Sequence, residues 1–461
     1  MTWFENWQNY IWVSKYLISI FLTVHILLKK SDHRSSLLWM ALVWAMPIFG
    51  GLFYILFGVN RISTRAAKLN YQSSKTIPKL EAGENSSDHW QSFNRLGKAV
   101  SGSPLLFGHV EEIISGNEII HERLLESISQ AHDSIFLSTY IFRKDKLGLE
   151  LADQLIAARK RGVEVKILLD GFGNFFYRSG IYKYLKKGGI NTKRFLHSIW
   201  PWGMPYLNLR NHRKILLIDG KIGFTGSCNI GEVSNIETQF KLSGEIVEAL
   251  AEIFANDWNM ITRENIPRMQ TKHIQAMDKA PNMRLISSGP NQKQEKIRWT
   301  ILGAMGAAQS HIRIVTPYFA PDRGLISGLI LAALRGINIE IILPSRSNYP
   351  FIDWASSRQF KPLLAVGVKI FRRDGVFDHS KMMTVDKKWA LIGSSNWDAH
   401  SIRLNFELDI ECHDPNFTHQ IDQLIDMRRN SSQLVIKDDY DDRNVFYKIR
   451  DSFARLFLPY L

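Results

Sequence analysis

The stretch His-Arg-Lys-Ile-Leu-Leu-Ile-Asp at residues 212–219 decides the fold, because its pattern occurs again as His-Ser-Lys-Met-Met-Thr-Val-Asp at residues 379–386. Seven residues after the Asp, each copy continues with Gly-Ser-x-Asn, at residues 226–229 and 393–396. The two windows also share a second Lys, at positions 221 and 388. All the shared residues except this second Lys are of types that phosphate chemistry uses. We therefore expect one structural unit to be present twice.

The spacing within each copy predicts a β-hairpin. Side chains alternate between the faces of a strand, so His212 and Lys214 point the same way, as do His379 and Lys381. The four residues that follow each Lys are mostly apolar and indicate a strand buried on both faces. Asp219-Gly220 is a tight-turn dipeptide, after which the chain returns as a paired strand.

Gly-Ser-x-Asn then closes the unit with a turn of small residues, where backbone N–H groups and an Asn amide can face an anion. One copy alone is most simply a hairpin with a solvated His and Lys. Two copies that match at their polar positions indicate a phosphate site instead.

These residues resemble the HxKx4D…GSxN signature of the phospholipase D superfamily, whose two halves each give one His, one Lys and one Asn to a shared phosphodiester site. The resemblance implies six catalytic residues and six that bind or support the phosphate. The former are His212, Lys214, Asp219, His379, Lys381 and Asp386, and the latter are Asn229, Asn396, Ser227, Ser394, Glu407 and Glu237.

The repeat extends beyond the motifs. Residues 131–139 (AHDSIFLST) recur as 308–316 (AQSHIRIVT), and residues 158–166 (ARKRGVEVK) recur as 332–340 (AALRGINIE). Each half reads as strand, helix, strand, helix, strand and then the motif hairpin, which predicts an α/β fold with helices covering a sheet. We expect two duplicated phospholipase D-like α/β domains, residues 104–267 and 286–461, joined by a linker at 268–285.

The N-terminal residues 1–60 have a different composition. Apolar stretches at about 11–28 and 37–57 predict a transmembrane helical hairpin, and the second stretch is long enough to cross a bilayer core. Residues 61–103 are polar, weakly periodic and predicted to be a linker. Lys and Arg are more numerous after the second stretch than between the two, which favours cytoplasmic catalytic halves in the bacterial inner membrane.

The formal net charge of +14 admits nucleic acid or anionic lipid as partner. The membrane anchor favours lipid, and so do the apolar side chains that precede the first motif. These are Phe172, Phe175, Phe176, Tyr177, Phe195, Ile199, Trp200, Trp202, Met204 and Tyr206. Core packing is the alternative interpretation of this cluster.

The two cysteines, Cys228 and Cys412, provide neither a disulfide framework nor a CxxC metal pair. Cys228 corresponds to Ser395 of the second copy, so we interpret it as a small packing residue and not as a nucleophile.

With the membrane segments included, the resemblance narrows to bacterial cardiolipin synthases. It includes the sequences at 138–142 (STYIF), 316–322 (TPYFAPD) and 405–407 (NFE). The family transfers a phosphatidyl group between two phosphatidylglycerol molecules and releases glycerol. Glu407 matches the family's acidic residue, whereas residues 230–244 are shorter than usual. Glu237 is the best candidate for the acidic residue of the first half.

The resemblance implies a phosphatidyl-histidine intermediate with no metal and no cofactor. His212 is then the nucleophile and His379 the general acid and base, although the two copies are symmetric in sequence. Asp219 and Asp386 have the wrong strand parity to share the His/Lys face, so we expect them to orient the site, while the family motif counts them as active-site residues. A membrane phospholipase D or another phosphatidyl transferase, differing in the acceptor, is the alternative. A phosphodiesterase or nuclease is a further one. No nucleic acid is expected, and the sequence leaves the oligomeric state open.

Overall fold

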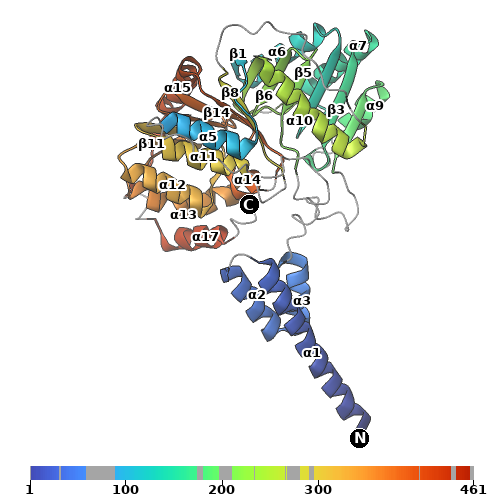
Figure 1. Ribbon diagram of the computed structural model, residues 1–461, viewed down its shortest axis with the longest axis vertical. Helices are drawn as coiled ribbons and strands as arrows, with labels where there is room; N and C mark the ends of the chain where they lie inside the picture. Colours follow the sequence, from blue (N-terminus) through green and yellow to red (C-terminus); the bar gives the residue numbers. More distant parts are fainter. Residues whose placement is uncertain are drawn as a thin grey trace. The chain divides into compact units, whose positions relative to one another are not determined.

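The computed structural model describes residues 2–30, 33–58, 89–173, 180–196, 210–232, 234–264, 266, 281–289, 295–403, 405–437 and 443–456. The chain divides into two compact units, Met1–Arg65 and Ala66–Leu461. Each unit is described by itself below (Figure 1).

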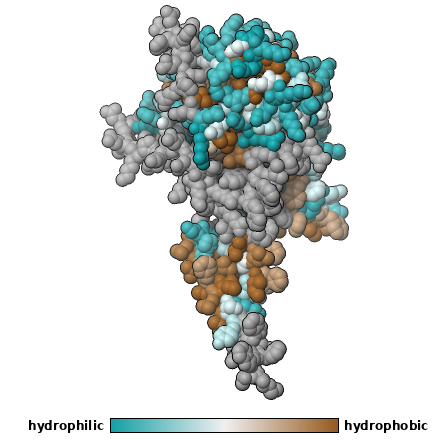
Figure 2. All heavy atoms as spheres, turned by 90° about the vertical axis from the view of Figure 1, so that its right-hand side faces the viewer, coloured by the Kyte–Doolittle hydropathy of each residue, from teal (hydrophilic) through white to brown (hydrophobic). Residues whose placement is uncertain are grey.

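The first unit is helical. Helix α1 (Thr2–Lys29) contains an apolar stretch, Trp12–Lys29, that is long enough to cross a membrane. Leu22 and Ile26 of α1 pack against Val43 and Tyr54. Figure 2 shows apolar residues covering most of the described surface of this unit, in brown. An apolar exterior of this kind suits lipid and not water.

The second predicted span is not one helix. Helix α2 (His33–Ala45) ends one residue before Met46, helix α3 (Pro47–Phe53) begins with a proline, and a π-helical turn, η1 (Tyr54–Gly58), follows. Proline has no backbone N–H and clashes with the preceding turn, so a helix that reaches it is interrupted. The prediction of an uninterrupted helix over residues 37–57 is therefore wrong.

The second unit contains two mixed sheets. The first has the strand order β1-β7-β6-β5-β2-β3-β4 and the second has β17-β12-β11-β9-β13-β14-β16-β8. The strands of the first sheet are β1 (Gly108–Ser115), β2 (Ser134–Thr139), β3 (Glu164–Asp170), β4 (Asn191–Phe195), β5 (Ile215–Ile218), β6 (Ile222–Gly226) and β7 (Thr238–Gly244).

The strands of the second sheet are β8 (Met283–Ser287), β9 (His311–Val315), β11 (Asn338–Pro344), β12 (Lys369–Arg373), β13 (Met382–Val385), β14 (Trp389–Gly393), β16 (Leu408–Cys412) and β17 (Ser432–Leu434). A separate parallel pair joins β10 (Phe319–Ala320) to β15 (Trp397–Asp398). Without β17, the second sheet repeats the order of the first, strand for strand. The duplicated α/β fold predicted from the sequence is therefore confirmed.

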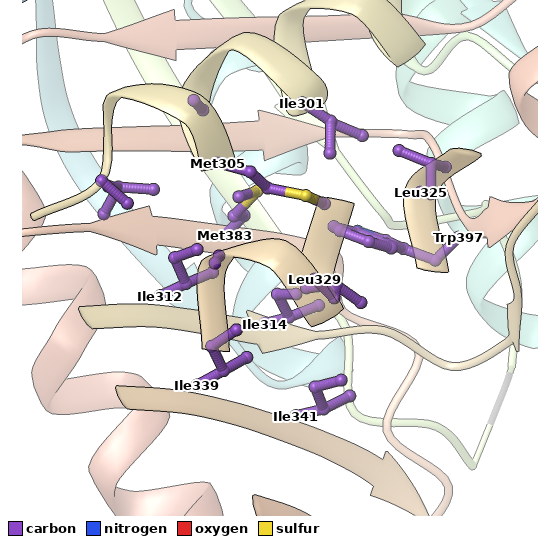
Figure 3. Packing of buried hydrophobic residues seen from close by; sticks show 14 of the residues in the cluster. Ile301, Met305, Ile312, Ile314, Leu325, Leu329, Ile339, Ile341, Met383 and Trp397 are labelled. Carbon is purple, nitrogen blue, oxygen red and sulfur yellow. The ribbon is translucent and has the colours of Figure 1, made fainter. Parts of the chain in front are cut away.

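Three apolar clusters hold the two sheets and their helices together. In the first half, α6 (Asn117–Ser129), α7 (Lys146–Lys160) and α9 (Ile181–Lys187) cover one face of the sheet. In the second half, α11 (Lys296–Ala307), α12 (Arg323–Leu334) and α13 (Pro350–Leu364) take the same place, and Figure 3 shows Met305, Leu325 and Leu329 packed against Ile312, Ile314 and Met383.

The third cluster is shared by the two halves. Helix α10 (Glu245–Thr262) of the first half and α15 (Pro415–Asn430) of the second both contribute to it. Phe136 of β2 lies in this shared cluster, whereas its neighbours Ile135 and Leu137 lie in the outer one, as the alternation of strand side chains requires. The two halves therefore form a single body with a common core.

The predicted linkers differ from the structure at their ends. Residues 89–101 form helix α5 (His89–Ser101), which lies along α11 and buries Phe93 against the second half (Figure 1). The prediction of a linker is wrong for this part of residues 61–103. The linker predicted at 268–285 lies mostly outside the described residues, and its last three residues already belong to β8. Two short helices complete the second unit, α14 (Ala399–Arg403) and α17 (Val445–Arg455).

Candidate active site

Both motif hairpins form as predicted. Strand β5 pairs with β6 and β13 pairs with β14, both antiparallel. Asp219-Gly220 and Asp386-Lys387 at the turns have positive φ angles of 52°, 63°, 53° and 56°. Positive φ at two successive residues matches the twist of a tight hairpin. Each His-Lys pair lies directly before the first strand of its hairpin.

The glycine of each Gly-Ser-x-Asn turn is required by a close backbone approach. A Cβ at Gly226 would lie 2.3 Å from the carbonyl oxygen of Thr238, and one at Gly393 would lie 2.2 Å from Oδ1 of Asp409. Both residues also have large positive φ angles, 153° and 158°. Any side chain there would displace the Ser and Asn that follow.

The two histidines are each paired with a glutamate of the other half. Nδ1 of His212 lies 3.0 Å from Oε2 of Glu407, and Nδ1 of His379 lies 3.0 Å from Oε1 of Glu237. All four side chains are buried. Because the carboxylate accepts a hydrogen bond from Nδ1–H, the other ring nitrogen, Nε2, is unprotonated and carries the lone pair. The pairing fixes the tautomer of both rings.

Backbone hydrogen bonds also connect each histidine to the other half. The N–H of His212 donates to the carbonyl oxygen of Phe406 at 2.9 Å, and the N–H of His379 donates to that of Ile236 at 2.8 Å. Each bond connects a histidine to the residue directly before the paired glutamate. The two halves therefore hold each other's histidine in place through both side chain and backbone.

Glu407 is held by several further donors. Ser394 and Ser401 donate through their hydroxyl groups at 2.6 Å, and the amide of Asn405 donates at 3.1 Å. Burial raises the pKa of Glu407, but His212, Lys214 and these hydrogen bonds outweigh it and hold the pKa at about 2. Glu407 is therefore a carboxylate anion at neutral pH.

Glu237 has the equivalent position in the first half. It accepts a hydrogen bond from Ser227 of the first Gly-Ser-x-Asn turn. Burial raises the pKa of Glu237, and His379 and Lys381 lower it by more. The serine of each motif thus orients the glutamate that serves the opposite histidine.

The two histidines are neutral at pH 7, because both of their pKa values are lowered from 6.5. Burial lowers the pKa of His212 to about 4, against the opposing effect of Glu407. Burial also lowers the pKa of His379, which Glu237 opposes. A neutral imidazole with a free Nε2 lone pair is the form that acts as a nucleophile or base.

Lys214 and Lys381 are buried next to the histidines. Their ammonium groups donate to the carbonyl oxygens of His212 and His379, at 2.8 Å and 2.5 Å. Burial lowers the pKa of Lys214 to about 8 and that of Lys381 to about 7, and Lys214 further lowers the latter. An anion bound between the two lysines would relieve this mutual repulsion.

The two motif asparagines are poised for a ligand. The side-chain oxygens of Asn229 and Asn396 are buried and accept no hydrogen bond from the described residues. The amide carbonyl cannot be satisfied by an anion, but a hydroxyl group can donate to it. A ligand with both an anionic oxygen and a hydroxyl would suit this pair.

Asp219 and Asp386 lie apart from this group, at the far ends of four-residue strands. Asp219 accepts backbone N–H bonds from Asp133 and Ser134 at 2.8 Å, and Asp386 accepts them from Gln309 at 2.8 Å and His311 at 3.0 Å. Each carboxylate thus ties its hairpin turn to the start of a neighbouring strand. These contacts favour the orienting role expected from strand parity over the catalytic role that the family motif gives these two residues.

Several residues of the site lay outside the motifs. The rings of Tyr140 and Tyr318 lie 5.1 Å and 6.1 Å from His212 and His379, each meeting the imidazole edge-on. The repeat places both tyrosines after equivalent strands, β2 and β9, so an alignment of the halves could have found them. Asn405 has a counterpart in Asn235, since each lies two residues before the glutamate of its half, so the same alignment could have found it. The contact of Ser401 with Glu407 was found only from the structure.

The aromatic cluster expected before the first motif lies partly outside the described residues. In the aromatic cluster, Phe195 is buried in the shared core and Phe172 is described, whereas residues 175–177 and 199–206 lie outside. Among the described residues, no group of three or more His, Cys, Asp or Glu side chains is arranged to hold a metal ion. Cys228 is buried, and burial raises its pKa well above the ordinary value, which disfavours the thiolate.

A family model described as "Cardiolipin synthase, PLD-like domain" matches residues 124–258 and 301–428, more than half of the chain. The chain belongs to the cardiolipin synthase family of phospholipase D-like enzymes. The family is one of phosphatidyltransferases. A second model, "Phospholipase D-nuclease N-terminal", matches residues 17–58.

Individual relatives agree with this family over nearly the whole length. The chain is 30% identical to "Cardiolipin synthase" of Alkalihalophilus pseudofirmus, over 96% of this chain and 92% of that one. It is 29% identical to "Major cardiolipin synthase ClsA" of Bacillus subtilis, over 97% and 100%. The crystal structure of phosphatidylserine synthase from Haemophilus influenzae is similar in fold, with a TM-score of 0.61, 15% identity and coverage of 79% and 97%.

Proposed function

We propose that this protein is a cardiolipin synthase that joins two phosphatidylglycerol molecules and releases glycerol. The observation that carries the proposal is the crosswise site, in which each histidine pairs with a glutamate of the other half. Besides burial, Lys381 lowers the pKa of His212 and Lys214 lowers that of His379, which supports one phosphodiester site shared by the two halves. The likeness to named cardiolipin synthases over both catalytic halves supports this substrate class.

The lysines bind the phosphodiester. Lys214 and Lys381 neutralise its nonbridging oxygens, and this charge is worth most in a buried site. The glycerol part of phosphatidylglycerol carries hydroxyl groups that can donate to the oxygens of Asn229 and Asn396. The phosphate anion thus contacts the lysines, and the glycerol hydroxyl groups contact the asparagine oxygens.

The histidines perform the transfer. Nε2 of His212 attacks phosphorus and forms a phosphatidyl-histidine, while His379 gives a proton to the departing glycerol oxygen. His379 then removes a proton from the hydroxyl of a second phosphatidylglycerol, whose oxygen attacks phosphorus and frees His212. In the first step the Nε2–P bond replaces the bond from phosphorus to the glycerol oxygen, and in the second step a new O–P bond replaces the Nε2–P bond. His379 regains in the second step a proton in place of the one that it gave in the first. The naming of His212 as nucleophile rests on family resemblance.

Binding of the anion prepares His379 for its role as an acid. In the free site its pKa is lowered, so the ring is neutral at pH 7. A phosphodiester placed beside the ring favours the charged form and raises the pKa. His379 therefore takes up its proton together with the substrate, with Glu237 stabilising the imidazolium.

The N-terminal unit is proposed to anchor the enzyme in the bacterial inner membrane. Helix α1 is long enough to cross, and the broken pair α2 and α3 would return the chain as a kinked second span. A multi-pass arrangement with cytoplasmic catalytic halves follows from the basic residues after the second segment.

Incubation of the purified protein in detergent with phosphatidylglycerol tests the function. We expect cardiolipin and glycerol in equal amounts. Phosphatidic acid as the main product would make it a phospholipase D, and product formation only with an added alcohol such as serine would make it another phosphatidyl transferase. The similarity in fold to a phosphatidylserine synthase does not decide between these acceptors.

A further inference from the structure

The C-terminal helix α17 presents its apolar side outward. Phe446 is 76% exposed, Ile449 60% and Leu456 71%, and Val445 and Phe453 are exposed as well. The helical spacing of its apolar residues in the sequence predicts a helix that packs on its own domain, with interfacial membrane contact as the alternative. The helix does pack there, against α13, but through the opposite side.

A cation–π contact joins the helix to α13, and an ionic cluster around Asp451 lies within the C-terminal segment itself. Asp451 is fully buried and accepts hydrogen bonds from Arg443 and Arg450 at 2.9 Å and 2.7 Å. The guanidinium of Arg450 lies 4.6 Å from the ring of Trp354 on α13. Asp451 and Ala454 are the buried residues of α17, and with the Arg450–Trp354 contact they place this side of the helix toward α13 and the apolar side outward.

Helix α13 connects α17 to the active site. Tyr349, directly before α13, is 52% exposed, and its ring lies 5.7 Å from that of Tyr318. Tyr318 in turn lies against the ring of His379. Packed aromatic side chains therefore lead from His379 to the protein surface at the start of α13, the helix on which α17 packs.

We propose that the exposed side of α17 inserts into the interface of an anionic phospholipid bilayer and holds this face of the second half at the lipid surface. Aromatic and aliphatic side chains on one face, with the exposed Arg455 and with Lys448 beside them, have the composition of an interfacial helix. The net charge of +14 adds attraction to anionic headgroups. A membrane-anchored chain keeps this face close to such a surface.

The proposal is tested by measuring depth in the bilayer. Full-length protein carrying Phe446→Cys or Ile449→Cys is spin-labelled and reconstituted in vesicles of phosphatidylglycerol and phosphatidylcholine. Ile119→Cys on α6 is the matched control, because Ile119 is also apolar and 49% exposed. The native Cys228 and Cys412 are buried, and the parent protein gives their background labelling.

We expect the labels at 446 and 449 to be accessible to oxygen and shielded from a water-soluble relaxant, and the label at 119 to show the reverse. Equal water accessibility at all three positions overturns the proposal. Shielding that appears without vesicles and grows with protein concentration also overturns it, since a second copy would then cover the face. These readouts do not depend on catalysis, so they fail or succeed separately from the proposed function.

A turnover measurement follows the same logic. Phe446→Ser combined with Ile449→Ser should lower cardiolipin formation on vesicles about tenfold while the rate in detergent is unchanged. Ile119→Ser should change neither rate. An equal loss for the double variant in vesicles and in detergent contradicts the membrane role of this face.

Discussion

The substitution Glu407→Gln tests whether the glutamate of one half supports the histidine of the other half or the histidine of its own half. The substitution keeps the size of the side chain and removes its charge. The pKa of Glu407 is lowered from 4.5 to about 2, which corresponds to about 3 kcal/mol of stability at neutral pH. Because Gln still accepts hydrogen bonds from some of the same donors, we expect a loss of about 1–3 kcal/mol.

The pH dependence of this loss has a definite sign. A carboxylate whose pKa is depressed in the folded state stabilises the protein above its unfolded pKa, and this contribution disappears as the pH falls through the folded value. The difference in unfolding free energy between wild type and Glu407→Gln should therefore shrink between pH 4.5 and about pH 2. Urea titrations at several pH values measure it.

Glu407→Gln should also lower the rate of the reaction step that His212 performs. A glutamine can present either its oxygen or its NH2 group to Nδ1 of His212, so the tautomer of the ring is no longer fixed. Losses of about 10²–10⁴ in rate are typical of that change in other enzymes. A phosphatidyl ester of p-nitrophenol needs no proton for its leaving group. Release of p-nitrophenol from it therefore reports the attack of the nucleophile alone.

The two glutamate variants should resemble the histidine variants of the opposite half. Glu407→Gln should show the p-nitrophenol pattern of His212→Ala, and Glu237→Gln that of His379→Ala, whichever histidine is the nucleophile. Glu411→Gln is the control for stability alone, because Glu411 is a buried carboxylate on β16, the strand that follows Glu407, and pairs with Arg284. A Glu407→Gln pattern that matches His379→Ala instead would refute the crosswise assignment.

Three further outcomes are expected. Asp219→Asn should lower the unfolding free energy by about 1–3 kcal/mol, because the carboxylate accepts three backbone N–H groups, and leave the rate in detergent within about threefold; a large rate loss at unchanged stability would give Asp219 a chemical role. Deletion of residues 1–60 should reduce turnover on bilayer substrate more than on detergent-dispersed substrate, and equal losses would argue against an anchor. Chelators such as EDTA should leave the rate unchanged, whereas loss of activity that added metal restores would contradict a metal-free mechanism.

The sequence predicted the repeated unit well because its signals are local. Strand parity placed His212 with Lys214 and separated Asp219 from them, and the positive-φ turn was readable from Asp219-Gly220. The pairing of His212 with Glu407 was not readable, since it depends on how two sheets face each other across a shared core. Glu237 was found as an acidic residue, but its partner, His379, lies 142 positions away.

Other differences have local physical causes. Pro47 was visible in the sequence and interrupts the second apolar helix, although hydropathy alone gave one span. In α5, Phe93 packs into the second half from within a polar stretch that resembles a linker. In α17, the regular apolar spacing identified the helix correctly but not its outward face, because the side that carries Asp451 and Ala454 is the one buried on α13.

The number of phosphatidyl groups that one chain can hold tests the central claim most directly. Mass spectrometry of the protein quenched in acid-free conditions after reaction with the p-nitrophenyl donor gives this stoichiometry and the labelled histidine. Two halves that share one site should hold at most one group per chain, on a single histidine, and Glu407→Gln should reduce it if His212 is that residue. A value near two, with adducts on both His212 and His379, would show two independent sites and contradict the account.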